Sequence, residues 1–357
     1  MRWIARYRKY INITIIAVCV AAFVYFAYLT ITRTETVIDT KVYAGSAMGT
    51  AVKKTIYSDN ISLCNQVDSI IDDTLEEFEK QISVRDMNSE IYQLNKNYAV
   101  GGVNPLSDNV LQYLQTEMQI WEETKGAFSP CVYPITSLWG IEDGQSEIPD
   151  AIQLQERLAC SDANNIELVD DGIIFHKDNM SIDLGAAGKG IACDVVKEQL
   201  MQTDVQGAVI SIGGSILAYG DKGDGKDWHI GIQDPRGATG DVLGIVDVSG
   251  NIVVSTSGDY EKYFELDGKR YHHIFNPNTG YPVDKGLISV SIVSDSGLLS
   301  DVLSTACFVL GLEEGMSYAK EKGVEAIFVT DTMDVYVTKG LEKSFRMQSD
   351  AYTLKKK

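Results

Sequence analysis

The chain has 357 residues, of which 45% are hydrophobic, so it is long enough for a membrane segment and a large globular domain with its own core. Acidic residues outnumber basic ones by 50 to 31, and the part beyond residue 31 carries a formal charge of about −23. This excess of negative charge argues against nucleic acid as a partner. It also means that an anionic ligand must be met by a local basic group or a metal ion.

The N-terminal segment has the charge pattern of a membrane anchor. Four basic residues lie within residues 1–10, and they precede an uncharged stretch from Ile11 to Ile31 that is long enough to cross a hydrocarbon layer of about 30 Å as a helix. Because positive charge stays on the cytoplasmic side, we expect residues 1–10 in the cytoplasm, a single span of the cell membrane over 11–31, and a globular domain outside the cytoplasm. A cleaved signal peptide and lipid attachment at Cys19 are the alternatives.

The remaining chain predicts one domain of the α+β class, with mixed or antiparallel sheets and flanking helices. We expect a linker over 32–42, the globular domain over 43–346 and a basic tail over 347–357, of which Lys355–Lys357 would be frayed. Hydrophobic periodicity predicts early helices over 63–82 and 110–124. Later runs of strand-forming residues predict strands over 208–212, 229–232, 244–248, 252–255, 287–293 and 326–330. The glycine-rich segment 220–226 lacks the residue order of a phosphate loop and predicts a surface hairpin turn.

A first candidate site lies in segment 300–311, which predicts the opening of an apolar helix. Asp301 and Thr305 are four residues apart and would share one face of it. Their carboxylate and hydroxyl oxygens suit Mg²⁺ or Ca²⁺ more than zinc. The structural alternative is a helix N-terminus with Ser300 as its cap and Asp301 favoured by the helix dipole.

A second candidate is segment 182–190, which predicts a strand end that turns through small residues into a helix from Ile191 onward. Such a turn exposes backbone N–H groups and admits close approach of a phosphate, and Lys189 supplies a local positive charge. A plain glycine-rich turn between strand and helix is the alternative.

A third candidate is segment 271–282, which contains two adjacent histidines. On a strand, His272 and His273 point to opposite faces, so they are poor joint ligands for one metal ion. One of them is a candidate general base, because histidine titrates near neutral pH. A structural histidine is the alternative.

Together these segments resemble the ApbE family of FAD:protein FMN transferases from about Met48 to Gly311. Eight pieces of the family pattern appear in order: Ala47–Thr50; Ser83–Ile91 with Leu94-Asn95; Gly126–Pro130 with Leu138–Gly140; Asp183–Gly185 with Lys189-Gly190; Ile212–Gly214; Ser255–Asp259; His273-Ile274 with Asn276–Gly280; and Asp301 with Thr305. Each piece is weak alone, but eight in the same order are specific.

The resemblance implies an ApbE-like catalytic domain that uses Mg²⁺ to transfer FMN from FAD to a threonine hydroxyl of a client flavoprotein, releasing AMP. The client would be an exported or membrane-embedded protein. The family's base corresponds to His273. Its metal ligands correspond to Ala186, through the backbone carbonyl, and to Asp301 and Thr305, with Ser304 nearby. Its FAD contacts correspond to Met48, Arg85, Ala127, Phe128, Ser129, Asp183, Lys189 and Ile274.

The chain departs from the family pattern at three places. Arg85 stands where many members have tyrosine, Ser129 where many have aspartate, and Ala186–Gly188 where Gly-Ile-Ala is common. An arginine is able to stack on a ring of FAD and to pair with a phosphate. Some members hydrolyse FAD. The alternatives are therefore a Mg²⁺-dependent FAD pyrophosphatase giving FMN and AMP, and a non-catalytic extracytoplasmic FAD-binding protein.

Overall fold

The computed structural model describes residues 39–355. The predicted cytoplasmic segment, the predicted membrane span and most of the predicted linker lie outside these residues. Among the helices of residues 39–355, none is both long and apolar enough to cross a membrane. The first strand already begins at Asp39, so residues 39–42 belong to the sheet and not to a linker.

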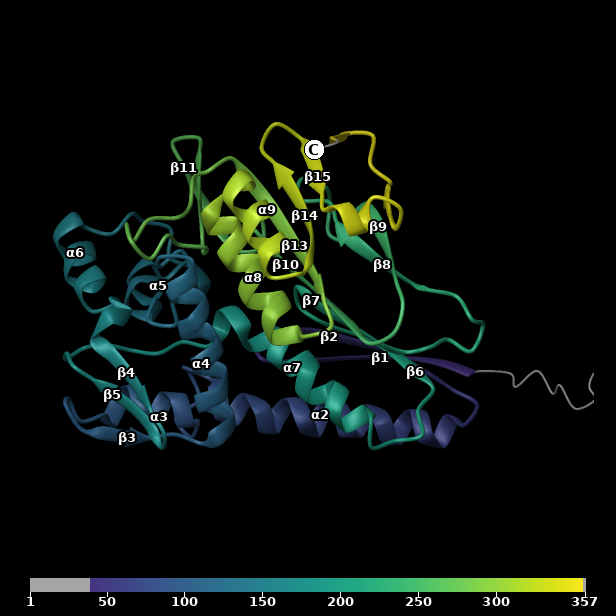
Figure 1. Cartoon of the computed structure of the whole chain (residues 1–357), viewed down its shortest axis with the longest axis horizontal. Coiled ribbons are helices and arrows are strands. Elements are labelled where there is room, and N and C mark those ends of the chain that lie inside the picture. Colours follow the sequence, from purple (N-terminus) through teal and green to yellow (C-terminus); the bar gives the residue numbers. More distant parts are fainter. Residues whose placement is uncertain (1–38, 356–357) are drawn as a thin grey trace, which may run out of the picture. The chain divides into compact units, whose positions relative to one another are not determined.

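Eight α-helices are found in the described part of the chain (Figure 1). They are α2 (Ile61–Ile82), α3 (Glu90–Asn97), α4 (Asp108–Glu123), α5 (Tyr133–Trp139), α6 (Ala151–Ala159), α7 (Gly185–Leu200), α8 (Gly297–Leu310) and α9 (Leu312–Glu321). Short 3-10 turns follow α5 at Ile141–Asp143, precede the strand at 166 as Ala163–Asn165, and occur again at Lys339–Leu341.

A nine-stranded sheet organises the fold, and its strand order is β1-β2-β6-β7-β10-β13-β14-β15-β17. Its members are β1 (Asp39–Ala47), β2 (Thr50–Ser58), β6 (Gly207–Ile212), β7 (Ser215–Gly220), β10 (Ile252–Gly258), β13 (Leu287–Ser294), β14 (Glu325–Thr330), β15 (Asp334–Val337) and β17 (Thr353–Lys355). The pairs from β2 to β15 are antiparallel, whereas β17 runs parallel to β15, so the sheet is mixed.

Three smaller sheets complete the described strands. One contains β16 (Phe345–Met347), β9 (Val242–Val248) and β8 (Trp228–Gln233). The second contains β3 (Val103–Pro105), β5 (Gly172–Phe175) and β4 (Ile166–Val169). The third is a hairpin of β11 (Tyr263–Leu266) and β12 (Lys269–His272), which projects beside α5 and α6 in Figure 1.

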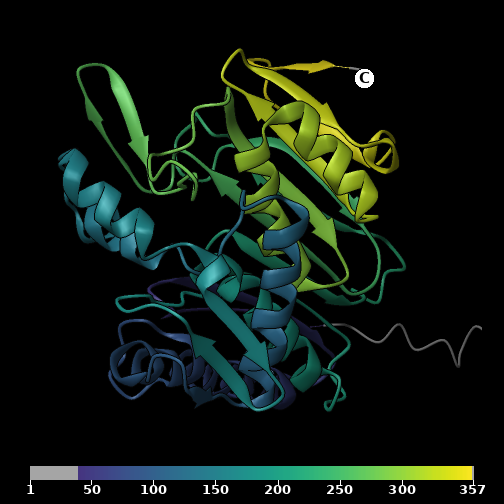
Figure 2. The ribbon, with the colours of Figure 1, turned by 60° about the vertical axis from the view of Figure 1, so that its left-hand side comes forward.

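Both faces of the large sheet are covered, and the alternation of side chains shows how. On β14, Ala326 and Phe328 belong to the core that holds α7 and α8, while Ile327 and Val329 belong to a second core shared with β8 and β9. Successive side chains of a strand point to opposite faces, so one strand serves both cores. Figure 2 shows α4, α8 and α9 in front of the large sheet. The result is a layer of helices, the large sheet and a small sheet behind it.

The sequence pattern predicted the regular elements well. The helices expected over 63–82 and 110–124 are α2 and α4, and all six expected strands are present as β6, β8, β9, β10, β13 and β14. The α+β class with mixed sheets and flanking helices is confirmed for the described residues.

Four local predictions were wrong. The helix expected from Ile191 begins at Gly185, because packing overrides the weak helix propensity of its glycines. The cap of α8 is Ser296, whose side chain accepts from the Leu299 amide, and not Ser300. The glycine-rich segment 220–226 joins two different sheets instead of closing a hairpin. Residues 352–355 of the predicted tail belong to the fold, because β17 pairs with β15 and Tyr352 is buried.

Helix α4 contains a carboxyl group that folding isolates from water. Glu117 is completely buried, and neither of its oxygens has a hydrogen-bond partner among the described residues. Burial, reinforced by the negative charges of Asp183 and Asp301, raises the pKa of Glu117 well above its ordinary value. The group is therefore neutral in the folded protein at pH values where it is ionised in the unfolded chain.

We expect the substitution Glu117→Gln to stabilise the protein increasingly as the pH rises. At pH values below the ordinary glutamate pKa of 4.5, Glu117 is protonated in both the folded and the unfolded wild type. Above that pH only the unfolded state releases the proton, which favours unfolding of the wild type but not of the variant. Urea unfolding of both proteins at about pH 5 and about pH 8 measures the difference.

Glu123 on the same helix is the matched control, because the pKa of its carboxyl group is shifted in the opposite direction. Burial alone would raise its pKa, but hydrogen bonds from Lys322 and Tyr318 lower it to about 2. Its ionised form therefore stabilises the folded state above its unfolded pKa, and Glu123→Gln loses stability at pH 8. Equal responses of the two variants to pH would contradict the assignment of Glu117 as a neutral buried acid.

Candidate active site

Helices α7 and α8 cross with their backbones in contact, and this crossing builds the centre of the site. A Cβ atom on Gly190 would lie 2.0 Å from the carbonyl oxygen of Gly297, and one on Gly297 would lie 2.0 Å from the carbonyl oxygen of Gly190. Only glycine fits at both positions. The crossing lets each helix bind the other: the Gly190 amide donates to Asp301 Oδ2 at 2.8 Å, and the Leu298 amide donates to Asp194 Oδ2 at 2.9 Å.

The predicted metal ligands come together at this crossing. In a regular helix the carbonyl of Ala186 points at the amide of Gly190. That amide donates to Asp301, so the Asp301 carboxylate lies beside the part of α7 that carries Ala186. Thr305 follows one turn later on α8 and is half-buried, with Ser304 buried beside it.

The donor set fits a hard cation. It consists of one buried carboxylate, hydroxyl groups and a backbone carbonyl, which are the ligands that Mg²⁺ prefers. In the described part of the chain, no three His, Cys, Asp or Glu side chains cluster so as to hold a metal ion by themselves. A metal site here would therefore depend on hydroxyl and backbone carbonyl oxygens in addition to the one carboxylate.

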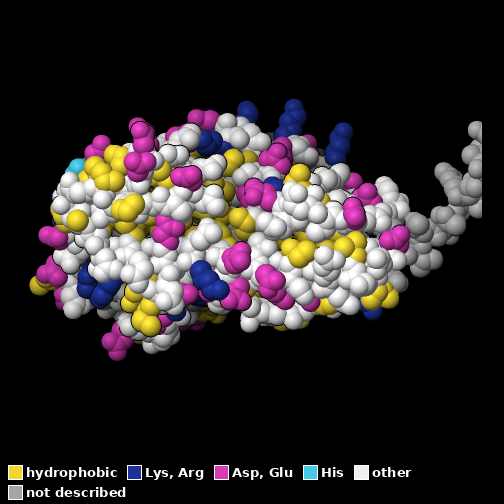
Figure 3. Space-filling view, turned by 90° about the horizontal axis from the view of Figure 1, so that it is seen from below, with side chains coloured by type: hydrophobic (Ala, Val, Ile, Leu, Met, Phe, Trp, Pro, Cys, Tyr) yellow, Lys and Arg dark blue, Asp and Glu magenta, His cyan; other side chains and the backbone are white. Residues whose placement is uncertain are grey.

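The charges at this place are only partly balanced. Asp301 is 3% exposed, and burial raises the pKa of its carboxyl, an effect that Lys189 opposes. The Asp301 carboxylate in turn raises the pKa of Lys189, which keeps the ammonium group charged. Figure 3 shows acidic side chains scattered over one face of the molecule between isolated basic ones, in keeping with the acidic composition of the chain.

His273 is held in one orientation by the backbone. Its Nδ1 lies 3.2 Å from the carbonyl oxygen of Lys262, which also accepts from the His273 amide at 3.1 Å. A carbonyl only accepts, so Nδ1 carries the proton and Nε2 has a free lone pair. Burial lowers the pKa of His273, against the opposing charge of Glu142, so the ring is neutral at neutral pH. His272 instead is buried, and its Nε2 lies 2.9 Å from the carbonyl of Val283.

The predicted FAD contacts lie around the start of α7. The Asp183 amide donates to the carbonyl of Pro130 at 2.8 Å, which ties this segment to the buried Ala127, Phe128 and Ser129. The Asp183 carboxylate accepts from the Gly185 amide at 2.7 Å, and burial raises the pKa of Asp183 to about 6. A Cβ on Gly188 would lie 3.4 Å from Met48 Cε, so Met48 lies against the same helix.

Two further motif pieces are joined by hydrogen bonds to the region after His273. The Trp139 indole donates to the carbonyl of Gly280 at 2.8 Å. The Asn278 side chain donates to the carbonyl of Lys125 at 3.4 Å. Ile274 is buried directly after His273. Asn95, on α3, exchanges hydrogen bonds of 2.7 and 2.8 Å with the backbone of Ile182 and so fixes the segment that leads to Asp183.

Arg85 is placed by acidic partners. Its guanidinium lies 2.9 Å from Asp143 and 3.4 Å from Glu142, and Glu142 also pairs with Lys262 at 3.0 Å. Glu142 thus connects the predicted flavin-contacting arginine with the loop that holds His273. Sequence reasoning missed Glu142 and Lys262, because only the fold brings residue 142 near residues 85 and 262.

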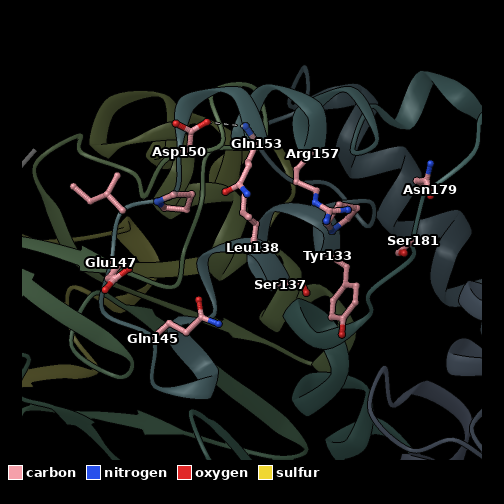
Figure 4. Close-up of a pocket in the computed structure, with 13 residues that line it drawn as sticks. Tyr133, Ser137, Leu138, Gln145, Glu147, Asp150, Gln153, Arg157, Asn179 and Ser181 are labelled. Atoms are coloured by element: carbon pink, nitrogen blue, oxygen red, sulfur yellow. Dashed lines mark hydrogen bonds between the residues drawn. The ribbon is translucent and has the colours of Figure 1, made fainter.

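A cavity of about 520 Å³ lies next to this site, between α5, α6 and the 179–181 segment (Figure 4). Its lining is polar and includes Tyr133, Asp150, Arg157 and Ser181, and a hydrogen bond between the Gln153 amide and Asp150 closes one side. None of the predicted site residues lines it. The predicted site residues therefore lie outside this cavity.

Comparison with known proteins identifies the family of this chain. The profile of the ApbE family matches residues 48–328. The chain belongs to the ApbE family. A protein from Klebsiella pneumoniae (strain 342) named FAD:protein FMN transferase is 32% identical over 307 residues, which cover 84% of this chain and 93% of that protein.

Solved structures of ApbE proteins share the fold. The apo form of the Pseudomonas stutzeri flavinyl transferase ApbE is 28% identical, with a TM-score of 0.75 over 87% of this chain and 98% of that one. The ApbE protein of Thermotoga maritima is 27% identical, with a TM-score of 0.78 over 86% of this chain and 100% of that one. The family resemblance drawn from eight short motifs is thereby confirmed.

In this ApbE-family protein, Gly190→Ala is expected to destabilise the fold by at least about 2 kcal/mol, because the new methyl group would overlap backbone atoms of α8 that cannot move independently. Gly188→Ala on the same helix is the control. Its methyl group would approach chiefly the end of the Ile82 side chain, at 2.8 Å, which is able to rotate away. Urea unfolding of the two variants measures the effect, and equal stabilities would argue against a tight crossing.

Proposed function

We propose that this protein transfers the FMN part of FAD to a hydroxyl group of a client protein, with AMP as the leaving group. Relatives named FAD:protein FMN transferase support the proposal. The observation that carries it is the hydrogen bond from the Gly190 amide of α7 to Asp301, whose charge also acts on Lys189, with Thr305 one turn further along α8. This arrangement supplies oxygen ligands and a positive charge at one place, as cleavage of a diphosphate requires.

In the proposed site, Asp301, Thr305 and the Ala186 carbonyl hold Mg²⁺, with Ser304 beside them. When bound, Mg²⁺ supplies the positive charge that stabilises the diphosphate as its bond breaks. Lys189 adds its ammonium group on the same side. The remaining predicted contacts orient FAD from the segments around Met48, Arg85, Ala127–Ser129, Asp183 and Ile274.

His273 acts as the general base in this proposal. Its Nε2 accepts the proton of the acceptor hydroxyl, which we propose to be that of a threonine, while the oxygen attacks the FMN-side phosphorus. The carbonyl of Lys262 holds the opposite ring nitrogen, so the acceptor nitrogen is fixed in place. AMP leaves as the new phosphoester bond forms, and positioning provides much of the rate.

The substitution His273→Ala tests this assignment. We expect transfer to slow by about 10²-fold to 10⁴-fold, because the base is lost, while FAD binding is retained. In-gel flavin fluorescence of a client flavoprotein measures transfer, and quenching of FAD fluorescence measures binding. His229→Ala is the control, because that histidine is exposed and pairs with Asp247. An unchanged transfer rate in the His273→Ala variant would refute the assignment of His273 as the general base.

The same assay separates transfer from hydrolysis and from simple binding. Covalent flavin that forms only when client is present supports transfer. Free FMN produced without client would show that water is the acceptor. If the protein binds FAD tightly but does not cleave it with any divalent metal ion, it is an FAD-binding protein and not an enzyme.

We further propose that residues 11–31 anchor the protein in the cell membrane and that the catalytic domain lies outside the cytoplasm. The basic residues before an uncharged stretch support this orientation. Alkaline phosphatase fused after residue 357 is expected to be active, since that enzyme matures only outside the cytoplasm. An inactive but intact fusion would reverse the proposed orientation.

A further inference from the structure

Beneath α8, strand β10 presents hydroxyl groups to the residues proposed to hold the metal ion. Ser255 and Ser257 are two residues apart on β10 and point to the same face. The Ser255 amide donates to Ser300 Oγ at 2.9 Å, while the Ser255 hydroxyl lies 2.9 Å from that of Ser215 on the neighbouring strand. One turn along α8, Ser257 Oγ lies 2.7 Å from Ser304 Oγ and 3.0 Å from Thr305 Oγ1.

The directions of these hydrogen bonds follow from counting protons. Ser304 Oγ donates to the carbonyl oxygen of Asp301 at 2.8 Å, and a hydroxyl has only one proton to donate. In its contact with Ser257, Ser304 must therefore accept, and Ser257 must donate. Because the proton of Ser257 is then used, the contact between Ser257 and Thr305 is formed by donation from Thr305.

The result is a directed chain of hydroxyl groups that runs from Thr305 to Ser257, then to Ser304, and ends at the carbonyl of Asp301. A hydroxyl that binds a cation has to present a lone pair to it and direct its proton elsewhere. The chain gives the proton of Thr305 a fixed acceptor. It also begins and ends on the two residues of α8 that are proposed to bind the metal ion.

We propose that Ser257 is a positioning residue that orients the Thr305 hydroxyl for binding of the divalent cation. Ser257 acts through Thr305 and does not itself touch the metal ion or FAD. Ser304 contributes in the same way, by closing the chain onto the Asp301 backbone. This inference rests on the Mg²⁺ site of the proposed function.

Direct binding of Mn²⁺ to the full-length protein without FAD, followed by electron paramagnetic resonance, tests the proposal apart from activity. We expect Ser257→Ala to weaken Mn²⁺ binding by about tenfold or more, as loss of a partner that orients a metal ligand does. Ser257→Thr keeps a hydroxyl group and is expected to restore binding. In the transfer assay, Ser257→Ala is expected to raise the Mg²⁺ concentration needed for half-maximal rate, with much of the maximal rate kept.

Thr256→Ala is the matched control, because Thr256 is the next residue and its hydroxyl lies 2.8 Å from Ser291 on the neighbouring strand instead of facing α8. We expect this variant to bind Mn²⁺ like the wild type. Thermal unfolding of both variants shows whether a loss of binding comes from a loss of fold.

Two outcomes would overturn the inference. One is a Ser257→Ala variant that binds Mn²⁺ as tightly as Thr256→Ala. The other is a wild-type protein that binds no divalent cation, which would remove the metal site as well. If Mn²⁺ binding depends on Ser257 but no flavin is transferred, the role of Ser257 stands and the proposed transfer fails.

Discussion

The backbone contact between α7 and α8 at Gly190 and Gly297 is the constraint on which the site depends. It brings the first turns of α7 close enough for their amide groups to reach a carboxylate on α8, and the start of α8 close enough to reach Asp194 on α7. The N-terminus of α8 thus receives a carboxylate from α7, which satisfies an amide group that a helix leaves unpaired, while the Asp301 carboxylate accepts from an amide just beyond the first turn of α7. One geometric feature therefore stabilises the helix pair and places Asp301.

Burying polar groups at the centre of a domain is costly unless each one has a partner, and the large sheet provides these partners. Helix α8 is apolar over most of its length, yet Ser300, Asp301 and Ser304 on it are buried. The strands beneath it supply hydroxyl and carbonyl groups as hydrogen-bond partners. Ser300 donates to the carbonyl of Ile292 at 3.0 Å, and the hydroxyl of Ser257 is hydrogen-bonded to that of Ser304. The polar side of the helix is matched by a polar strip on the sheet.

Sequence reasoning predicted the elements that local periodicity determines and failed where tertiary packing decides. The amphipathic pattern of α2 and α4 and the apolar runs of β13 and β14 are visible in single segments. The start of α7 was placed six residues too late, because its glycines disfavour a helix until α8 packs against them. The end of the chain was taken for a tail, because its few strand residues become recognisable only through pairing with β15.

The same distinction applies to the site. Motifs located the predicted residues. The roles of Glu142 and Lys262, and the chain of hydrogen-bonded hydroxyl groups through Ser257, depend on contacts between distant segments. Gly190 in α7 and Gly297 in the opening turn of α8 were the available signals for the crossing, because glycine weakens a helix unless close packing requires it.

The charges of the site give a physical reason for a cation. The charge of Lys189 is opposed by that of Asp301, and Arg85 is already paired with Asp143 and Glu142. The basic groups near the site are thus offset by acidic ones, in a chain that is strongly acidic throughout. A diphosphate entering this environment would meet little net positive charge from the protein. A divalent ion held by Asp301 and uncharged oxygens would supply that charge without another basic side chain.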